Sequence, residues 1–342
     1  MNKIYIGMDL HKSTSSFCVM NKEGEILKEQ RIATTPESIT RFIKSLGKKN
    51  KISITFEPVS QSWRYIDIFE EMNLDIHPAN PRKLKAIATA TSKTDKLDAR
   101  VLADHLRTNH LPESYIPPKE VRGWKELVRN RSSLVRLRTQ AKNRIHSVLF
   151  KNGLASPFQT LWTARAKKWL RTLELEPHFR LTIEKQLSVI EHLDKEIKDV
   201  EKTIKEIVKE TKQMQLLKTI PGVGDIFAIS IMSEIGDIKR FKNYKKLQSY
   251  AGLAPWVRNS GGKTWTGHIT KRGSAWLRYA VIELAVSIAR TRKSSDLKDY
   301  YLKVKRNKGG KTATVATARK SLAIIWAVLH NERKFEARYP AI

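Results

Sequence analysis

Four acidic residues in the first third of the chain have the types and spacing of a metal-dependent phosphate site. In "IYIGMDL" aliphatic residues occupy every second position of an expected strand, and Asp9 falls on the opposite face. Glu57 has the same relation to the strand "ISITFEP". In "SKTDKLDAR", Asp95 and Asp98 are three residues apart, which places both on one side of a helix. If the two strands pair, the four carboxylates can converge, and they then need cations to offset their repulsion.

Mg²⁺ is the expected ion because it is a hard, octahedral cation that prefers oxygen ligands. Two such ions about 4 Å apart activate an attacking oxygen and stabilise a leaving oxygen at a phosphate. Each acid also has an ordinary interpretation. Asp9 fits a turn at a strand end, Glu57 a solvated edge residue, and the paired aspartates an exposed helix face beside Lys96 or Arg100. The order of the four acids in a strongly basic chain favours the metal site.

A second candidate is Ser260 in "RNSGGKTWTG", where a serine precedes two glycines. A serine hydroxyl needs activation before it attacks, and glycine lets a nucleic-acid strand approach the backbone closely. The alternative is a serine that only helps a turn. Ser249 and Ser274 are weaker candidates because both fit helical or capping positions. The basic residues expected to bracket a phosphate here are Arg258, Lys263, Lys271 and Arg272.

The charge of the chain indicates a polyanionic partner. Its 342 residues include 65 Lys and Arg against 34 Asp and Glu, a net charge of +31. The excess concentrates in residues 239–320, with 21 basic and 3 acidic side chains, and in residues 119–151, with 10 and 2. Nucleic acid is the first candidate partner, and these two regions are expected to face it.

Other classes of protein are disfavoured. The start, "MNKIYIGMDLHK", is an alternating strand and does not fit a signal peptide. The apolar helix "AWLRYAVIELAVSIA" carries Arg278 and Glu283, so no membrane insertion is expected. The single cysteine, Cys18, excludes an internal disulfide and a cysteine-rich zinc site. A soluble, cytoplasmic protein is expected.

The pattern of expected elements predicts an α/β domain followed by helices. Strands at 3–10, 16–20 and 25–33 form a meander, and alternating helices and strands follow to about residue 82, which is typical of a ribonuclease-H-type domain. A long basic helix is expected over 120–150. Its residues expected to contact phosphates are Arg129, Arg131, Arg136, Arg138 and Arg144.

Two further features lie in the middle of the chain. Apolar residues from Ile190 to Met214 alternate by three and four, which predicts a coiled coil with a partner chain; a helix packed within the monomer is the alternative. Pro221-Gly222-Val223-Gly224 resembles a helix-hairpin-helix turn, in which Gly222 and Gly224 would expose N–H groups to a phosphate. A plain helical corner is equally compatible with this stretch.

The set of Asp9, Glu57, Asp95 and Asp98 resembles a RuvC-like active site. Together with the "YAGLAPWVRNSGGKTWTGHITKRGSAWLRYAV" block, it is similar to the insertion-sequence one-ten family of transposases, relatives of the Piv and MooV invertases. The resemblance implies that Ser260 is the nucleophile and that the four acids hold Mg²⁺. It also implies a homo-oligomer, a tetramer, that acts on target and donor DNA with a structured guide RNA.

The expected organisation is a RuvC-like domain over 1–115, a basic helical region over 116–180, a coiled coil over 181–214 and a helical transposase domain over 215–342. Three functions compete. The first is a serine-dependent, metal-assisted recombinase. The second is a hydrolytic nuclease of the junction-resolvase type, with Ser260 incidental, and the third is a non-catalytic nucleic-acid-binding scaffold. The loop block favours the first because a plain nuclease has no evident use for it.

Overall fold

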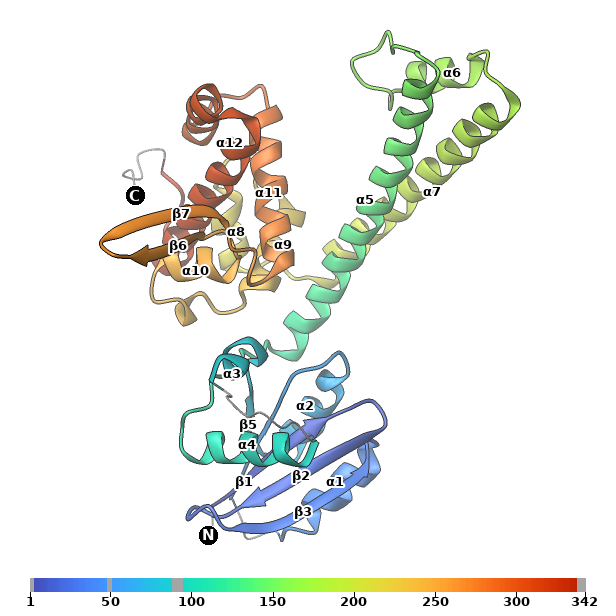
Figure 1. Ribbon diagram of the computed structural model, residues 1–342. Helices are drawn as coiled ribbons and strands as arrows, with labels where there is room; N and C mark the ends of the chain where they lie inside the picture. The colour runs from blue at the N-terminus through green and yellow to red at the C-terminus, as the bar shows by residue number, and fades with distance from the viewer. Residues whose placement is uncertain (1–2, 48–50, 88–94, 337–342) are drawn as a thin grey trace. The chain divides into compact units, whose positions relative to one another are not determined.

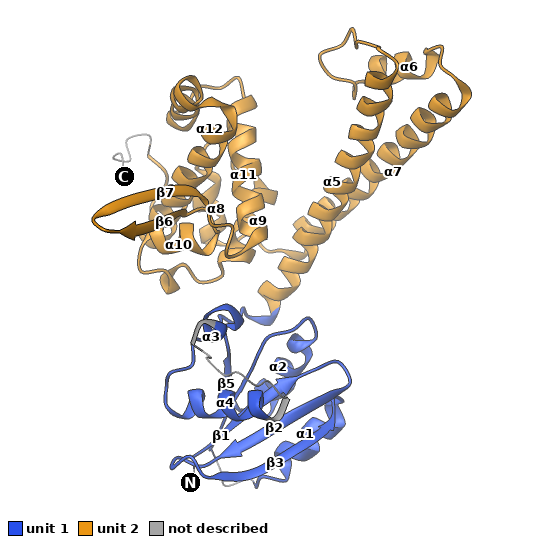
Figure 2. Cartoon of the chain, viewed as in Figure 1, with its two compact units in different colours: residues 1–119 blue, residues 120–342 orange. Residues whose placement is uncertain are grey.

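The computed structural model describes residues 3–47, 51–87 and 95–336, without the side chains at 86, 87, 95 and 96. The chain forms two compact units, Met1–Lys119 and Glu120–Ile342, and each is described by itself (Figure 2). The domain boundaries expected at residues 115, 180 and 214 remain predictions.

The first unit is built on a mixed sheet with strand order β3-β2-β1-β4-β5 (Figure 1). The first three strands are antiparallel neighbours, and β1, β4 and β5 run parallel. The strands are β1 (Lys3–Leu10), β2 (Thr14–Met20), β3 (Ile26–Ala33), β4 (Lys51–Phe56) and β5 (Asp75–Pro78). The predicted meander followed by alternating helices and strands is therefore confirmed.

Helices cover both faces of this sheet. On one face, α1 (Pro36–Lys44) and α2 (Ser62–Glu71) pack on the aliphatic side chains of β1 and β4, as the alternation predicted. On the other face lies α4 (Asp95–Arg107), and a short helix, α3 (Pro81–Ile87), precedes it in the chain. Helix α4 approaches β1 so closely that a Cβ on Gly7 would stand 2.0 Å from the carbonyl oxygen of Ala99. Gly7 thus permits the contact that fixes α4 on the sheet.

The second unit is mostly helical, and its main core gathers apolar side chains from α8 to α12 and from parts of α5 and α7. Its helices are α5 (Lys119–Lys151), α6 (Ala164–Thr172), α7 (Pro177–Ile207), α8 (Lys212–Lys218), α9 (Asp225–Ile235), α10 (Tyr244–Tyr250), α11 (Ala275–Arg290) and α12 (Asp296–His330), with a 3₁₀ turn η1 (Ile238–Arg240). The mixed first unit and helical second unit confirm the broad fold class, and the RuvC-like assignment remains a proposal.

The apolar seam of α7 is covered within the chain. Ile190 packs with Ile145 and Val148 of α5, and Ile204 joins the main core of the unit. Ion pairs flank the seam, including Arg131 Nη2 to Glu201 Oε1 at 2.7 Å. The prediction that a partner chain covers this seam is therefore wrong, because α5 of the same chain occupies it.

The seam is also shorter than predicted. Helix α7 ends at Ile207, and Thr211 caps α8 by accepting a hydrogen bond from the Met214 N–H at 3.2 Å. Met214 belongs to a separate helix, so the predicted continuous helix over 190–214 is wrong at its C-terminal end. A coiled coil with another chain is not needed to bury these residues.

Helix α12 is the one helix of the described residues that is long and apolar enough to cross a membrane. Its apolar window is 61% buried, however, and Leu322, Ile325 and Val328 lie in the main core of the second unit. The helix bends at Gly309, which has a φ of 80°. The composition of α12 is thus accounted for by the core that it forms.

Candidate active site and nucleic-acid interface

Two of the four predicted acids lie at the same edge of the first sheet. Strands β1 and β4 are parallel neighbours, and their last paired residues are Met8 and Phe56. Asp9 is the next residue of β1 and Glu57 directly follows β4, so the structure brings these two positions side by side, as predicted. The Asp9 side chain is 15% exposed, and Glu57 is exposed.

The helix with the other two acids begins at this edge. At the far end of α4, Arg107 Nη1 donates to the Lys22 carbonyl in the β2–β3 turn at 3.3 Å. Because that turn lies at the opposite end of the sheet from Asp9, α4 runs back along β1 and its first turn lies toward Asp9. Asp98 is exposed in this first part of α4. Arg100, one of its alternative partners, pairs instead with Glu29 of β3 at 2.8 Å.

His11 is a further member of this edge that was not predicted from the sequence. Its Nε2 lies 2.9 Å from Asp9 Oδ2, and its carbonyl accepts a hydrogen bond from the Gln61 side chain at 2.8 Å. The spacing Asp-x-His just past a strand is the signal that points to it. His11 therefore orients the Asp9 carboxylate.

The chemistry of the acids fits a divalent ion, since carboxylate oxygens are the ligands that Mg²⁺ prefers. Within residues 3–47, 51–87 and 95–336, no three His, Cys, Asp or Glu side chains are already gathered in a metal-binding arrangement. The Asp95 side chain lies outside the described atoms, so this absence does not extend to the complete four-acid set. The neighbouring strand ends and the direction of α4 fit a site at this edge.

Ser260 lies at the tip of a β-hairpin. Strands β6 (Pro255–Ser260) and β7 (Lys263–Ile269) are antiparallel, and Ser260 pairs with Lys263 across a two-residue turn. Gly261 and Gly262 form this turn with φ values of 56° and 73°. Positive φ at both positions is the requirement of a tight type I′ hairpin, which glycine meets without strain.

One face of this hairpin carries the chemistry predicted for the loop. Because paired residues of antiparallel strands share a face, Ser260 lies with Lys263, and Arg258 with Trp265, on the same side. All four residues are exposed. We call this side, including Trp256, the serine face. It presents a hydroxyl beside two cations.

The base of the hairpin is held firmly to the second unit. Thr270 N–H donates to the Ala254 carbonyl at 2.9 Å, and Lys271 N–H donates to the Gly252 carbonyl at 3.0 Å. Gly273 packs so tightly that a Cβ would stand 2.1 Å from the Tyr250 carbonyl oxygen. Lys271 and Arg272 are exposed at this base, away from the tip. The hairpin thus projects from a base that is hydrogen-bonded and closely packed against the rest of the second unit.

The Pro-Gly turn between α8 and α9 has a packing role. A Cβ on Gly222 would stand 3.2 Å from the Leu284 side chain of α11, whereas Gly224 has open space around it. The first residue of α9, Asp225, forms ion pairs with Lys218 at 2.8 Å and Lys205 at 3.3 Å. A carboxylate therefore already occupies the helix N-terminus at which a phosphate was predicted.

Three of the five arginines predicted on α5 form ion pairs within the chain. Arg129 pairs with Glu234 of α9, and Arg131 and Arg138 pair with residues of α7 at 2.7 and 2.6 Å. Arg144 is exposed, and among the described residues it has no carboxylate within 4 Å. These internal pairings are not evident from the sequence, because the acidic partners lie 56 to 105 residues away in the chain.

Two models of known protein families match this chain, one over the segment with the acids and one over the segment with the serine hairpin. A model described as "Transposase", of the DEDD type in IS110, matches residues 6–151, and a model described as "Transposase IS116/IS110/IS902 family" matches residues 214–302. The chain belongs to the IS110/IS116/IS902 family of transposases. The four acids lie in the first matched segment, and Ser260 lies in the second.

Relatives support the same assignment over most of the chain. The transposase for insertion sequence element IS1111A of Coxiella burnetii is 24% identical over 96% of this chain and 90% of its own length. Transposases for IS1533 of Leptospira borgpetersenii and IS1328 of Yersinia enterocolitica are 26% and 23% identical, over 74% and 83% of this chain and 76% and 83% of their own lengths.

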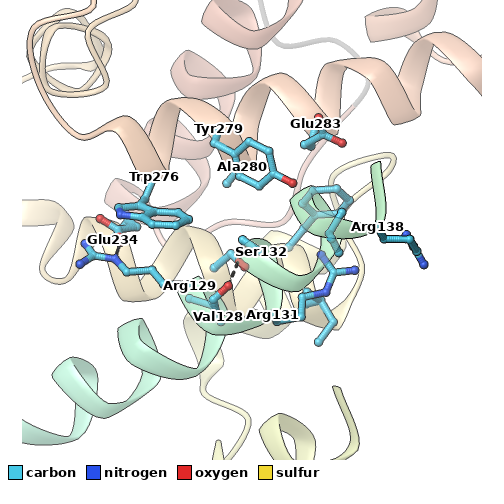
Figure 3. Close-up of a pocket in the computed structure, with 14 residues that line it drawn as sticks. Val128, Arg129, Arg131, Ser132, Arg138, Glu234, Trp276, Tyr279, Ala280 and Glu283 are labelled. Atoms are coloured by element: carbon cyan, nitrogen blue, oxygen red, sulfur yellow. Dashed lines mark hydrogen bonds and ion pairs between the residues drawn. The ribbon is translucent and has the colours of Figure 1, made fainter. Parts of the chain in front are cut away.

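In this transposase a pocket of about 210 Å³ lies between α5, α9 and α11 (Figure 3). On its wall, the indole of Trp276 is approached by Arg129 and Arg136, at 5.5 and 4.6 Å from the ring centroid. Arg129 also binds Glu234 at 2.7 Å, and the Ser274 hydroxyl donates to Glu234 at 3.0 Å. Trp276 is therefore engaged by cations of its own chain.

Glu234 is the buried centre of this cluster, with 3% of its side chain exposed. It holds Ser274, whose hydroxyl also accepts a hydrogen bond from the Leu277 N–H and so caps α11. Burial lowers the pKa of the nearby Lys125 to about 8, while Glu234 raises it and Arg129 lowers it further. Glu234 thereby fixes the start of α11 beside the base of the serine hairpin, a role that its place inside an apolar run conceals in the sequence.

Proposed function

We propose that this transposase cuts and rejoins DNA through a covalent link to Ser260. The Ser260 Oγ attacks a DNA phosphorus and loses its proton, and the bond from phosphorus to the 3′ oxygen breaks. The leaving oxygen takes up a proton, which gives a phosphoserine and a free 3′-hydroxyl. A hydroxyl from another strand then attacks the phosphoserine and releases Ser260, so exchange needs no external energy.

The observation that carries this proposal is the position of Ser260 on the serine face. Its hydroxyl is exposed at the tip of the hairpin, and Arg258 and Lys263 lie on the same side. Two cations beside a nucleophile offset the charge of a phosphate and hold it for attack. Ser249 is exposed in α10 but lies outside this face, and Ser274 is bound to Glu234 as a helix cap.

The acids of the first unit would hold the divalent ion. We assign this role to Asp9, Glu57, Asp95 and Asp98, with Mg²⁺, two ions per site, as the preferred occupant. Such an ion supplies Lewis-acid stabilisation of phosphate oxygens when it is bound. In the protein itself, His11 holds the Asp9 carboxylate in place, and the contact at Gly7 positions the start of α4.

Further proposals concern partners. A homo-oligomer, a tetramer, and a structured guide RNA follow from the family resemblance, together with action in the cytoplasm on target and donor DNA. The exposed Lys271 and Arg272, and the exposed Arg136 and Arg144 of α5, remain candidate nucleic-acid contacts. Isolation of the protein from cells followed by sequencing of bound RNA tests the guide: a single structured RNA from the same element is expected, and nonspecific cellular RNA contradicts it.

The catalytic proposal is tested with substrate DNA and Mg²⁺ on a denaturing gel. We expect a slow-migrating DNA species that protease treatment removes and that Ser260→Ala abolishes. Asp9→Ala should remove it as well, because the acids are needed for the same step. Val257→Ala, on the other face of the same hairpin, is the matched control and should leave the adduct unchanged.

Two outcomes overturn the proposal. DNA cleavage that survives Ser260→Ala but not Asp9→Ala identifies a hydrolytic nuclease in which water is the nucleophile. DNA binding without cleavage by the wild-type protein, with both donor and target DNA and its RNA supplied, identifies a binding scaffold.

A further inference from the structure

Among the residues of its unit that the structure describes, none covers the serine hairpin. From Trp256 to His268 all residues of its two strands are exposed, so neither face is buried. Isolated two-stranded hairpins are only marginally stable in water. An exposed hairpin on a firmly bonded base therefore indicates a surface that is completed by a ligand.

The two faces of the hairpin differ sharply. The outer part of one face has Val257, Asn259, Thr264 and Thr266, none of which is charged. The serine face has Arg258, Ser260, Lys263 and Trp265. Trp256 also lies on it, because a Cβ on Gly267 would stand 3.1 Å from the Trp256 ring and Gly267 alternates with Trp265 and Lys263 along β7. The tryptophan, lysine and arginine side chains of the two strands are thus all on the side of the serine.

The two tryptophans differ from those in the core. Trp256 is 49% exposed and Trp265 is 48% exposed, whereas Trp124 is 7% exposed. Trp326 donates its indole N–H to the Phe241 carbonyl at 2.9 Å, and Trp276 is covered by arginines. Within the described part of the chain, no ring or cation contact engages Trp256 or Trp265. Two large indole surfaces therefore remain exposed to water on the same face as Ser260 and its neighbouring cations.

We propose that Trp256 and Trp265 stack on unpaired bases of the DNA strand whose phosphate lies at Ser260. Indole rings bind base faces without regard to sequence, and neighbouring cations bind the backbone. Residues 254–273 contain four basic side chains and no acidic ones, which matches a polyanion. A paired duplex shields its base faces, so this surface fits a strand that has been opened.

The geometry places the bases next to the reacting phosphate. Strand residues advance about 3.3 Å each, so Trp265 lies about 7 Å from the Ser260 rung and Trp256 about 13 Å from it. Gly267 leaves room for the Trp256 ring on this face. The tryptophans thus serve as positioning residues for the strand. This inference rests on the proposed role of Ser260 only for the position of the phosphate.

The test is binding of the full-length protein to labelled 20-nucleotide DNA without Mg²⁺, measured by fluorescence anisotropy. Single-stranded and duplex forms of one sequence, and the matching RNA strand, are compared. Trp265→Ala and Trp256→Ala should each weaken single-stranded DNA binding about tenfold, as expected for one lost stack, and weaken duplex binding much less. Trp265→Phe should retain most of the affinity. Val257→Ala, similarly exposed on the other face, is the control and should change neither affinity.

Equal losses on single-stranded and duplex DNA, or equal losses in Val257→Ala, would overturn the stacking. A loss confined to the RNA strand would also overturn it and would make the surface an RNA site. Binding by Ser260→Ala and the site of the covalent adduct together separate the two proposals. If DNA binding still depends on the tryptophans while the adduct forms on another residue, stacking stands and the serine mechanism fails. If the adduct forms on Ser260 but binding does not depend on the tryptophans, the serine mechanism stands and stacking fails.

Discussion

At the scale of single residues, exposure of Ser260 depends on the two glycines that follow it. Both have positive φ, which lets the chain reverse in two residues and places the serine at the extreme tip of β6. A longer turn would set the hydroxyl among mobile residues. At Glu234, one buried carboxylate binds both Arg129 and the Ser274 hydroxyl that caps α11.

Glu234→Gln should lower the free energy of unfolding by about 3 kcal/mol. This is the lower end of the range for a broken buried ion pair, because Arg129 is still 35% exposed. Glu201→Gln is the matched control: its pair with Arg131 is 31% and 24% exposed, and its loss should cost less than about 1 kcal/mol. Urea denaturation measures both, and equal losses would contradict the central role of Glu234.

His77 provides a pH-dependent contact in the first unit. Its ring nitrogens lie 3.0 Å from Asp75 and 2.8 Å from Glu113. Burial lowers the pKa of His77, but the hydrogen bonds and charges of these carboxylates outweigh it and raise the pKa above its ordinary value. Its contribution to stability is therefore complete below the ordinary pKa of about 6.5 and is lost as pH rises through the raised value.

Comparison of wild type with His77→Gln tests this contact. The difference between their urea midpoints, followed by circular dichroism, should be largest near pH 5.5 and should shrink by pH 8.5. A difference that stays constant or grows with pH would show that the charged imidazole does not contribute.

At the scale of elements, the contact between α4 and β1 positions one half of the proposed metal site. Gly7→Ala should destabilise the protein by about 1–3 kcal/mol and weaken the Mg²⁺-dependent activity, because the new methyl group meets the α4 backbone. Gly123→Ala in α5 is the control. Nothing lies within 4 Å of its Cβ position, so it should stabilise the helix by about 0.5–1 kcal/mol. Urea denaturation that finds Gly7→Ala neutral would contradict the close packing.

An element can be predicted from the sequence when residues close to it in the chain determine its structure. Alternation along β1 and the Ser274 cap depend on nearby residues, and both are confirmed. The partner of the α7 seam is α5, whose Ile145 and Val148 lie more than forty residues before Ile190, so periodicity alone cannot choose between α5 and a second chain. The hairpin signal was present in "SGGK", since two glycines between polar strands favour a two-residue turn.

At the scale of the whole molecule, the cations behind the net charge of +31 are not all equally available to a ligand. Arg131 and Arg138 are offset by carboxylates of α7, whereas the hairpin cations have no acidic neighbours in residues 254–273. Composition predicts the polyanionic partner, but only the fold separates cations used within the chain from those left for a ligand.

Salt dependence of binding separates these two groups of cations. The double change Arg258→Gln and Lys263→Gln should reduce the slope of log K against log salt concentration by about 1.4 on single-stranded DNA, if each contacts one phosphate. The pair Arg131→Gln and Arg138→Gln should leave the slope nearly unchanged. Anisotropy titrations at several salt concentrations measure both, and a larger effect of the α5 pair would contradict the assignment.

The most direct measurement is identification of the amino acid that carries DNA after the reaction is stopped. The protein is incubated with its DNA and Mg²⁺, denatured and digested, and the nucleotide-linked peptide is sequenced by mass spectrometry. The account predicts a single modified peptide in which the Ser260 oxygen carries a 5′-phosphate of the cut strand. Cut DNA with a free 5′-phosphate and no linked peptide, or a link at any residue other than Ser260, would contradict it.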